Sequence, residues 1–155
     1  QGDSSEDLRI IEDAMRKTNV LDMADRYVNT MSGGERQKVI IARAMAQTPK
    51  ILLMDEPTLH LDISAQFDIL DLVYSLSRSE GLTVVIVSHD LPMVARYCDR
   101  ILMIHDHTIH ALGRTEEVLT PENMRTVFGV DAELSVDPKS GRNTITMHGS
   151  ATSRI

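Results

Sequence analysis

The sequence predicts an α/β fold in which helices alternate with short strands of a parallel sheet. The first observation is the pair of short apolar runs at 51–54 and 82–87. Runs of this length and composition are typical of strands that are buried on both faces of a parallel sheet. The second observation is the helical spacing of apolar residues in the segments that flank these runs, as over 8–18 and 63–79.

Composition and charge narrow the class of protein. The 155 residues are 42% hydrophobic and 25% charged, the balance of one globular domain. A net charge of −7 argues against a nucleic-acid surface. Cys98 is the single cysteine, which excludes an intramolecular disulfide and fits an intracellular location. No apolar run approaches the ~18 residues that a membrane-spanning helix needs.

The first third of the chain is predicted to be helical. Apolar spacing indicates a helix over 8–18 and a short helix over 21–27, and the polar residues 1–7 predict a frayed end. A further helix is expected over 32–47. Ser32 and Glu35 have the spacing of a capping box, in which each side chain binds the backbone amide of the other residue.

The elements after the first strand also follow from local pattern. In chain order, we expect a helix over 63–79, a helix from Pro92 to Tyr97, a hairpin that turns at Asp106 and His107, short helices over 115–128 and a weak hairpin over 130–147. The small and polar residues of 149–155 predict disorder.

Polar residues follow both predicted strands. Asp55 and Glu56 end the first, and Ser88 and His89 end the second. Because ligands bind at the carboxyl ends of parallel strands, we expect these groups on one rim. One carboxylate can bind a hard cation such as Mg²⁺, and the other can accept a proton from an attacking water. The histidine can orient that water or contact a phosphate.

A serine and two glycines open the helix expected over 32–47. Glycine lets the backbone approach a ligand closely, and a helix start presents free amides, so Ser32, Gly33 and Gly34 form a candidate phosphate site. Taken alone, the glycines fit a simple turn, and the acidic and histidine-bearing strand ends fit solvated or capping residues. Their occurrence together, in this order, favours phosphate chemistry.

Four segments resemble the nucleotide-binding subunit of ABC transporters. MSGGERQ resembles the family's signature segment, ILLMDEP its Walker B strand, LHLD its D-loop and VSHD its histidine switch. The resemblance runs to about Met147. It implies part of a P-loop NTPase sheet flanked by helices, with a piece of the helical subdomain at the N-terminus. The implied division is 1–48 for the helical part and signature helix, 49–114 for the catalytic core and 115–155 for the C-terminal part.

The resemblance implies roles in catalysis for three residues. Asp55 would hold Mg²⁺, Glu56 would be the general base for the hydrolytic water, and His89 would contact the γ-phosphate.

The resemblance also implies an ATP site shared between two subunits. Ser32, Gly33 and Gly34 would bind the γ-phosphate of an ATP held mainly by the opposite subunit. Glu35 would reach the ribose side of that nucleotide, and Asp62 would link the two sites across the dimer.

The G-x-x-x-x-G-K-[ST] phosphate loop and the glutamine loop are absent from these residues. We therefore expect both to lie before Gln1, and we expect the chain alone to be inactive although its parent protein is an ATPase. The implied partners are a second nucleotide-binding subunit in a homodimer, transmembrane permease subunits and, indirectly, a substrate-binding protein, with no nucleic acid. The implied location is cytoplasmic, peripheral on the inner face of the cell membrane.

Three segments resemble importers for iron–siderophore, haem and cobalamin: 57–73, 116–134 and 137–145. Leu59 departs from the small serine that this group usually has before the position of His60.

Two alternatives remain open. One is a soluble ABC-type ATPase that is not linked to transport, which would favour tandem domains, a basic arm or coiled-coil heptads. The other is a non-catalytic fragment or interaction module. A metal site at His105, His107 and His110 is a weaker interpretation than exposed polar residues on a hairpin.

Overall fold

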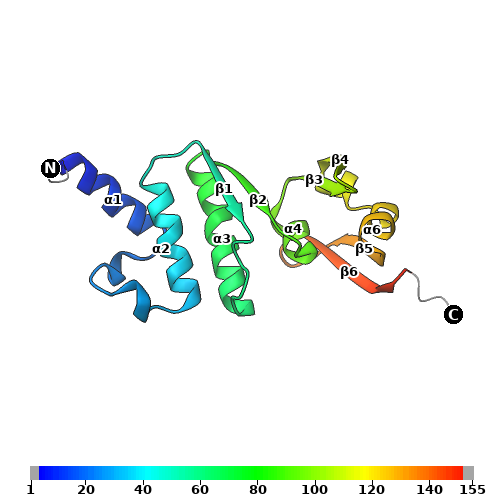
Figure 1. Ribbon diagram of the computed structural model, residues 1–155, viewed down its shortest axis with the longest axis horizontal. Coiled ribbons are helices and arrows are strands. Elements are labelled where there is room, and N and C mark those ends of the chain that lie inside the picture. The colour runs from blue at the N-terminus through cyan, green and yellow to red at the C-terminus, as the bar shows by residue number, and fades with distance from the viewer. Residues whose placement is uncertain (1–3, 152–155) are drawn as a thin grey trace. The chain divides into compact units, whose positions relative to one another are not determined.

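The computed structural model describes residues 4–151 and forms two compact units, Gln1–Val87 and Ser88–Ile155 (Figure 1). The first unit holds α1 (Ser5–Lys17), the 3₁₀ turns η1 (Leu21–Met23) and η2 (Val28–Thr30), α2 (Gly33–Met45), β1 (Ile51–Asp55), α3 (Ile63–Ser79) and β2 (Thr83–Val87). The second holds α4 (Leu91–Tyr97), β3 (Arg100–His105), β4 (Thr108–Arg114), α5 (Thr115–Val118), α6 (Pro121–Phe128), β5 (Val130–Val136) and β6 (Asn143–Ser150).

A parallel pair of strands organises the first unit. β1 pairs with β2 in register from Ile51 opposite Thr83 to Asp55 opposite Val87, which confirms the predicted parallel sheet. The helix α3 connects the two strands and lies beside them (Figure 1). Its inward side chains pack with alternate strand residues in a core that contains Ala14, Ile41, Met45, Leu52, Met54, Ile69, Leu72, Val73, Leu76 and Leu82. The core is aliphatic, as the composition requires.

The opposite face of this sheet is apolar and exposed. Ile51, Leu53 and Val87 are 59%, 74% and 60% exposed. Successive strand residues point to opposite faces, so these side chains lie opposite Leu52 and Met54. The prediction that both faces are buried is therefore wrong within residues 4–151, where the packed elements cover one face. The sequence pattern anticipated a covering layer that these residues do not supply.

The N-terminal part is more ordered at its start and less helical at 21–27 than predicted. Ser4 caps α1 through a capping box with Asp7, so residues 4–7 of the predicted frayed end are ordered, and residues 1–3 lie outside the described residues. Over the expected short helix 21–27, the chain forms the 3₁₀ turn η1 followed by irregular backbone, and the second 3₁₀ turn, η2, comes after it.

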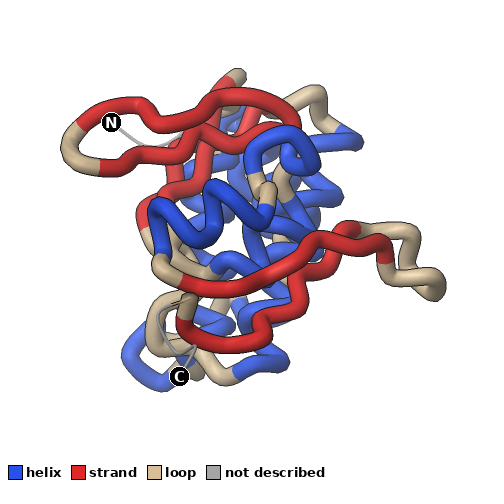
Figure 2. Tube along the Cα trace, turned by 90° about the vertical axis from the view of Figure 1, so that its right-hand side faces the viewer, coloured by secondary structure: helices blue, strands red, loops and turns tan. Residues whose placement is uncertain are grey.

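The second unit contains two antiparallel hairpins, which appear in Figure 2 as paired red strands joined by tan turns. The β3–β4 turn is at Asp106 and His107, as predicted. Both residues have left-handed φ values, 46° and 61°, which is the backbone of a two-residue type I′ turn. Buried residues of α4, β3, α5, α6 and β5 form a separate core: Ala95, Met103, Val118, Leu119, Met124 and Ala132.

The C-terminal hairpin is longer than predicted. β6 extends to Ser150, so Gly149 and Ser150 belong to a paired strand rather than to a disordered tail. The turn between the strands also contacts α4, because Arg96 lies 3.8 Å from the Asp137 carboxylate. The rest of the predicted disorder, 152–155, lies outside the described residues.

None of the helices in the described part of the chain combines the length and hydrophobicity that a bilayer span requires. The division into segments 1–48, 49–114 and 115–155 stays a prediction.

We expect Ile69→Ala to lower the free energy of unfolding by about 2–5 kcal/mol, because it leaves a cavity at a side chain that is 0% exposed. Urea denaturation of the chain measures this change. Ile63→Ala, on the same helix at a side chain that is 72% exposed, is the matched control and should change stability by less than about 0.5 kcal/mol. Equal losses for the two variants would contradict the assigned orientation of α3.

Candidate functional site

The signature segment, residues 31–37, places a capping box at the start of α2. The Glu35 amide donates to Oγ of Ser32 at 3.2 Å, and the Ser32 amide donates to Oε2 of Glu35 at 2.7 Å. The predicted reciprocal cap is therefore confirmed. It fixes the backbone at the point where the chain enters the helix.

The next amides of the helix remain available to a ligand. Gly33 and Gly34 occupy the first two helical positions, and among residues 4–151 their amides have no protein acceptor. The Ser32 hydroxyl accepts the Glu35 amide and keeps its own proton for donation. Two free amides and one hydroxyl at a helix N-terminus can bind an anionic oxygen. The grouping predicted from the sequence is thus present at one helix start.

The two glycines also allow close packing, a role that the sequence reasoning missed. A Cβ atom at Gly33 would lie 3.0 Å from Cδ2 of Leu61, and one at Gly34 would lie 3.1 Å from Cβ of Ala65. Leu61 belongs to the LHLD segment, and Ala65 lies in the first turn of α3. The glycines therefore bring the signature segment against the start of α3 within the first unit.

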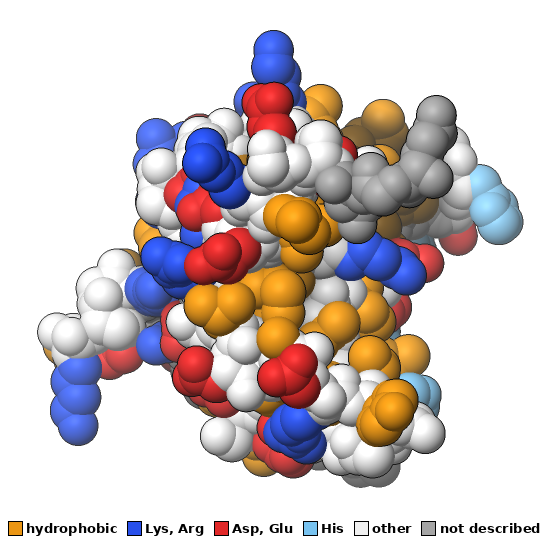
Figure 3. Space-filling view, turned by 90° about the vertical axis from the view of Figure 1, so that its left-hand side faces the viewer, with side chains coloured by type: hydrophobic (Ala, Val, Ile, Leu, Met, Phe, Trp, Pro, Cys, Tyr) orange, Lys and Arg blue, Asp and Glu red, His pale blue; other side chains and the backbone are white. Residues whose placement is uncertain are grey.

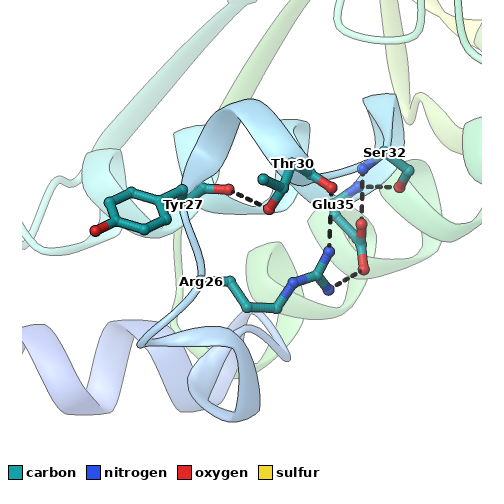
Figure 4. A network of polar contacts seen from close by, with 5 residues as sticks. All are labelled: Arg26, Tyr27, Thr30, Ser32 and Glu35. Carbon is teal, nitrogen blue, oxygen red and sulfur yellow. Dashed lines mark hydrogen bonds and ion pairs between the residues drawn. The ribbon is translucent and has the colours of Figure 1, made fainter.

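Arg26 is a second residue that sequence reasoning did not identify (Figure 4). Its Nη1 donates to Oε1 of Glu35 at 2.8 Å, and its Nη2 donates to the Thr30 carbonyl at 3.3 Å. The hydrogen bond from the Ser32 amide, followed by the one from Arg26, lowers the pKa of Glu35 below its ordinary value. No periodic pattern links residues nine positions apart across an irregular segment, so the sequence carried no signal for this contact.

Asp55 and Glu56 lie where β1 ends. Asp55 is the last residue of the strand and pairs with Val87. Glu56 has a left-handed φ of 44°, and its amide donates to the Val87 carbonyl at 2.9 Å. A non-glycine residue in this conformation is uncommon, and the bond to β2 holds it there. The two carboxylates therefore leave the sheet at a sharp and fixed turn of the backbone.

The D-loop, residues 59–62, connects this turn to α3. The Leu59 amide donates to the Glu56 carbonyl at 3.1 Å, and the Leu61 amide donates to the Thr58 carbonyl at 3.2 Å. Oδ1 of Asp62 accepts the Ala65 amide at 2.9 Å, so Asp62 is the N-cap of α3. This capping role is additional to the one expected for Asp62 at a dimer interface, which stays a prediction.

His89 belongs to the second unit and precedes α4. The Asp90 amide donates to Oγ of Ser88 at 3.1 Å, and Oδ1 of Asp90 accepts the Met93 amide at 3.1 Å. These bonds define the backbone on both sides of His89. Its expected place on one rim with Asp55 and Glu56 stays a prediction.

The histidines of the β3–β4 hairpin do not form a metal centre in the described part of the chain. The rings of His105 and His110 meet edge to face with centroids 6.0 Å apart. Nε2 of His110 lies 3.0 Å from Oδ1 of Asn123, within hydrogen-bonding distance. Within residues 4–151 no group of three His, Cys, Asp or Glu side chains is arranged to hold a metal ion.

Comparisons with known proteins agree with the segments that resemble ABC transporters. Residues 3–59 match the family model described as ABC transporter. The chain is 42% identical over 146 residues to a probable siderophore transport system ATP-binding protein of Bacillus subtilis, covering 94% of this chain and 53% of that protein. It is 41% identical over 140 residues to a cobalamin import ATP-binding protein of Halobacterium salinarum, covering 90% of this chain and 35% of that protein.

The fold agrees with a solved structure as well. One chain of an inward-facing ABC transporter assigned to the metal-chelate type superposes with a TM-score of 0.85 and 29% identity, covering 94% of this chain and 59% of that one. This likeness confirms the predicted α/β class. The chain spans about half the length or less of the curated relatives described here. The combined sequence and structural agreement confirms the predicted resemblance to the ATP-binding domain of ABC transporters.

Proposed function

We propose that this chain supplies the signature side of an ATP-hydrolysing site in the ATP-binding subunit of an importer. The observation that carries the proposal is the pair of free amides at Gly33 and Gly34 beside the Ser32 hydroxyl. These donors suit the γ-phosphate of an ATP molecule whose remaining contacts come from a second subunit. The chemistry is phosphoryl transfer to water, in which positioning and charge stabilisation supply most of the rate enhancement.

The end of β1 supplies the groups that act on water and metal. The Asp55 carboxylate is the hard oxygen ligand that Mg²⁺ prefers, and bound Mg²⁺ would offset phosphate charge. Glu56 accepts the proton of the attacking water, and its strained backbone supports a fixed position for that base. His89 orients the same water and contacts the γ-phosphate.

The proposal also includes contacts across the two subunits. Asp62 lies one residue after Leu61, which packs on the signature glycine Gly33. A partner subunit that binds the D-loop would therefore also lie close to the signature segment. In this proposal Glu35 contacts the ribose side of the nucleotide with the carboxylate that also closes the capping box.

The assembly that we propose has a second ATP-binding subunit, transmembrane permease subunits and, indirectly, a substrate-binding protein. A solved relative that is 32% identical, with a TM-score of 0.59, is described as a dimeric post-hydrolysis state of an ATP-binding cassette bound to ADP and phosphate. Relatives named for siderophore, hydroxamate and cobalamin import support iron-chelate or cobalamin uptake as the process. The working location would be the inner face of the cell membrane.

The alternative of an ABC-type ATPase that acts on nucleic acid has less support. The net charge of −7 disfavours a polyanionic partner. On the face drawn in Figure 3, acidic and basic side chains are interspersed around a group of hydrophobic ones, so that face carries no basic stripe. A non-catalytic role for these residues alone remains compatible with the missing phosphate loop.

In the complete protein that contains this chain, Glu56→Gln should lower the turnover number for ATP by about 10²–10⁴-fold, because the amide cannot accept the proton of water. ATP binding should persist. Phosphate release and equilibrium ATP binding measure the two effects. Glu122→Gln, the same change at an exposed position of α6, is the control. Unchanged turnover in Glu56→Gln would remove Glu56 from the mechanism.

Gly34→Val should lower the free energy of unfolding by about 1–3 kcal/mol and raise the KM for ATP, because the new side chain meets Ala65 and moves α2 away from α3. Arg43→Val places the same side chain at an exposed position of α2 and should cost less than about 0.5 kcal/mol. Denaturation and ATPase titration measure these changes. A Gly34→Val protein of unchanged stability would contradict the close approach described above.

A further inference from the structure

An acidic side chain lies at a helix start that the proposed function assigns to phosphate. The Glu35 carboxylate binds the amide of Ser32, immediately before the free amides of Gly33 and Gly34. A carboxylate at the start of a helix interacts favourably with the same positive end of the dipole that attracts an anionic ligand. Left unpaired, Glu35 would both repel a phosphate and compete with it for the amides.

Arg26 pairs with the Glu35 carboxylate and with the loop before Ser32. One guanidinium nitrogen donates to Oε1 of Glu35, and the other donates to the carbonyl of Thr30, two residues before Ser32. The other oxygen of Glu35 already accepts the Ser32 amide. The Arg26 guanidinium therefore binds one residue on each side of Ser32, Thr30 before it and Glu35 after it (Figure 4).

We propose that Arg26 is a positioning residue for the signature segment. It holds the Glu35 carboxylate on the Ser32 amide, neutralises its charge and anchors the loop through the Thr30 carbonyl. The amides of Gly33 and Gly34 then face an incoming phosphate without a competing free carboxylate. This inference rests on the proposed function for the identity of the anion, whereas the loop contacts can be tested without nucleotide.

The choice of arginine follows from the two acceptors. The guanidinium group is a planar fork that can serve a carboxylate and a carbonyl at once, whereas an ammonium is a point charge. Arg26→Lys should keep the neutralisation of Glu35 and lose the grip on Thr30. Arg26→Ala should lose both effects.

The first test is amide hydrogen exchange at Ser32 in this 155-residue chain, followed by NMR. In Arg26→Ala the Ser32 amide should exchange about 10-fold faster, because its acceptor is no longer held. Arg26→Lys should fall between Arg26→Ala and the parent chain. Arg16→Ala removes an exposed arginine from a pair with Glu12 on α1 and should leave the Ser32 amide unchanged. A change below about 2-fold in Arg26→Ala would overturn the proposal.

The second test separates charge neutralisation from general support of the loop. In the complete protein, Arg26→Ala should raise the KM for ATP about 10-fold and change kcat less, because the exposed carboxylate opposes nucleotide binding. In a Glu35→Gln background, where any ribose contact of Glu35 is already altered, Arg26→Ala should change the KM for ATP less than about 2-fold, since the amide accepts the Ser32 hydrogen bond without a charge. An equally large rise of KM in both backgrounds would refute the electrostatic role.

The two tests also distinguish this inference from the function on which it rests. If the complete parent protein does not hydrolyse ATP, the proposed function fails, and the exchange rates still decide whether Arg26 orders the segment. If ATP is hydrolysed and both Arg26 variants behave like the parent protein, only the inference about Arg26 fails.

Discussion

The close approach of α2 to α3 is the constraint on which the candidate site depends. The absence of side chains at Gly33 and Gly34 favours it, because a Cβ at either position would make an unusually tight contact with Leu61 or Ala65. The same absence leaves the amides of the helix start open to a ligand. One packing requirement thus explains both why the signature and D-loop segments lie together and why the exposed backbone is at their junction.

The negative charge of Glu35 at this junction is stabilised by neighbouring polar groups. The Ser32 amide and Arg26 both stabilise the charged form of Glu35, which lowers its pKa below the ordinary value. The acidic cap orders the loop, and the arginine limits the effect of its charge on an incoming anion. A neutral cap would need no such partner. The ion pair of Arg26 with Glu35 therefore holds the loop in one geometry without adding net charge to it.

Much of the fold could be predicted from local sequence because its determinants are local. The Ser32–Glu35 cap and the turn at Asp106 and His107 are set by residues within a few positions of each other. Predictions failed where the outcome depends on distant neighbours. The exposure of Leu53 depends on which elements cover the sheet, and the contact between Arg26 and Glu35 depends on the path of an irregular segment. Neither has a signature in periodicity or propensity.

The backbone between β1 and α3 explains how carboxylates at its two ends are fixed together. The Glu56 amide is bound to β2, its carbonyl accepts the Leu59 amide, and the segment ends where Asp62 caps α3. The left-handed conformation at Glu56 stores strain that these bonds offset. A displacement of α3 would therefore act on Asp62 and on Glu56 through one short, hydrogen-bonded path. Because the first turn of α3 also packs on Gly34, one helix contacts both the proposed anion site at α2 and the segment that carries the proposed base.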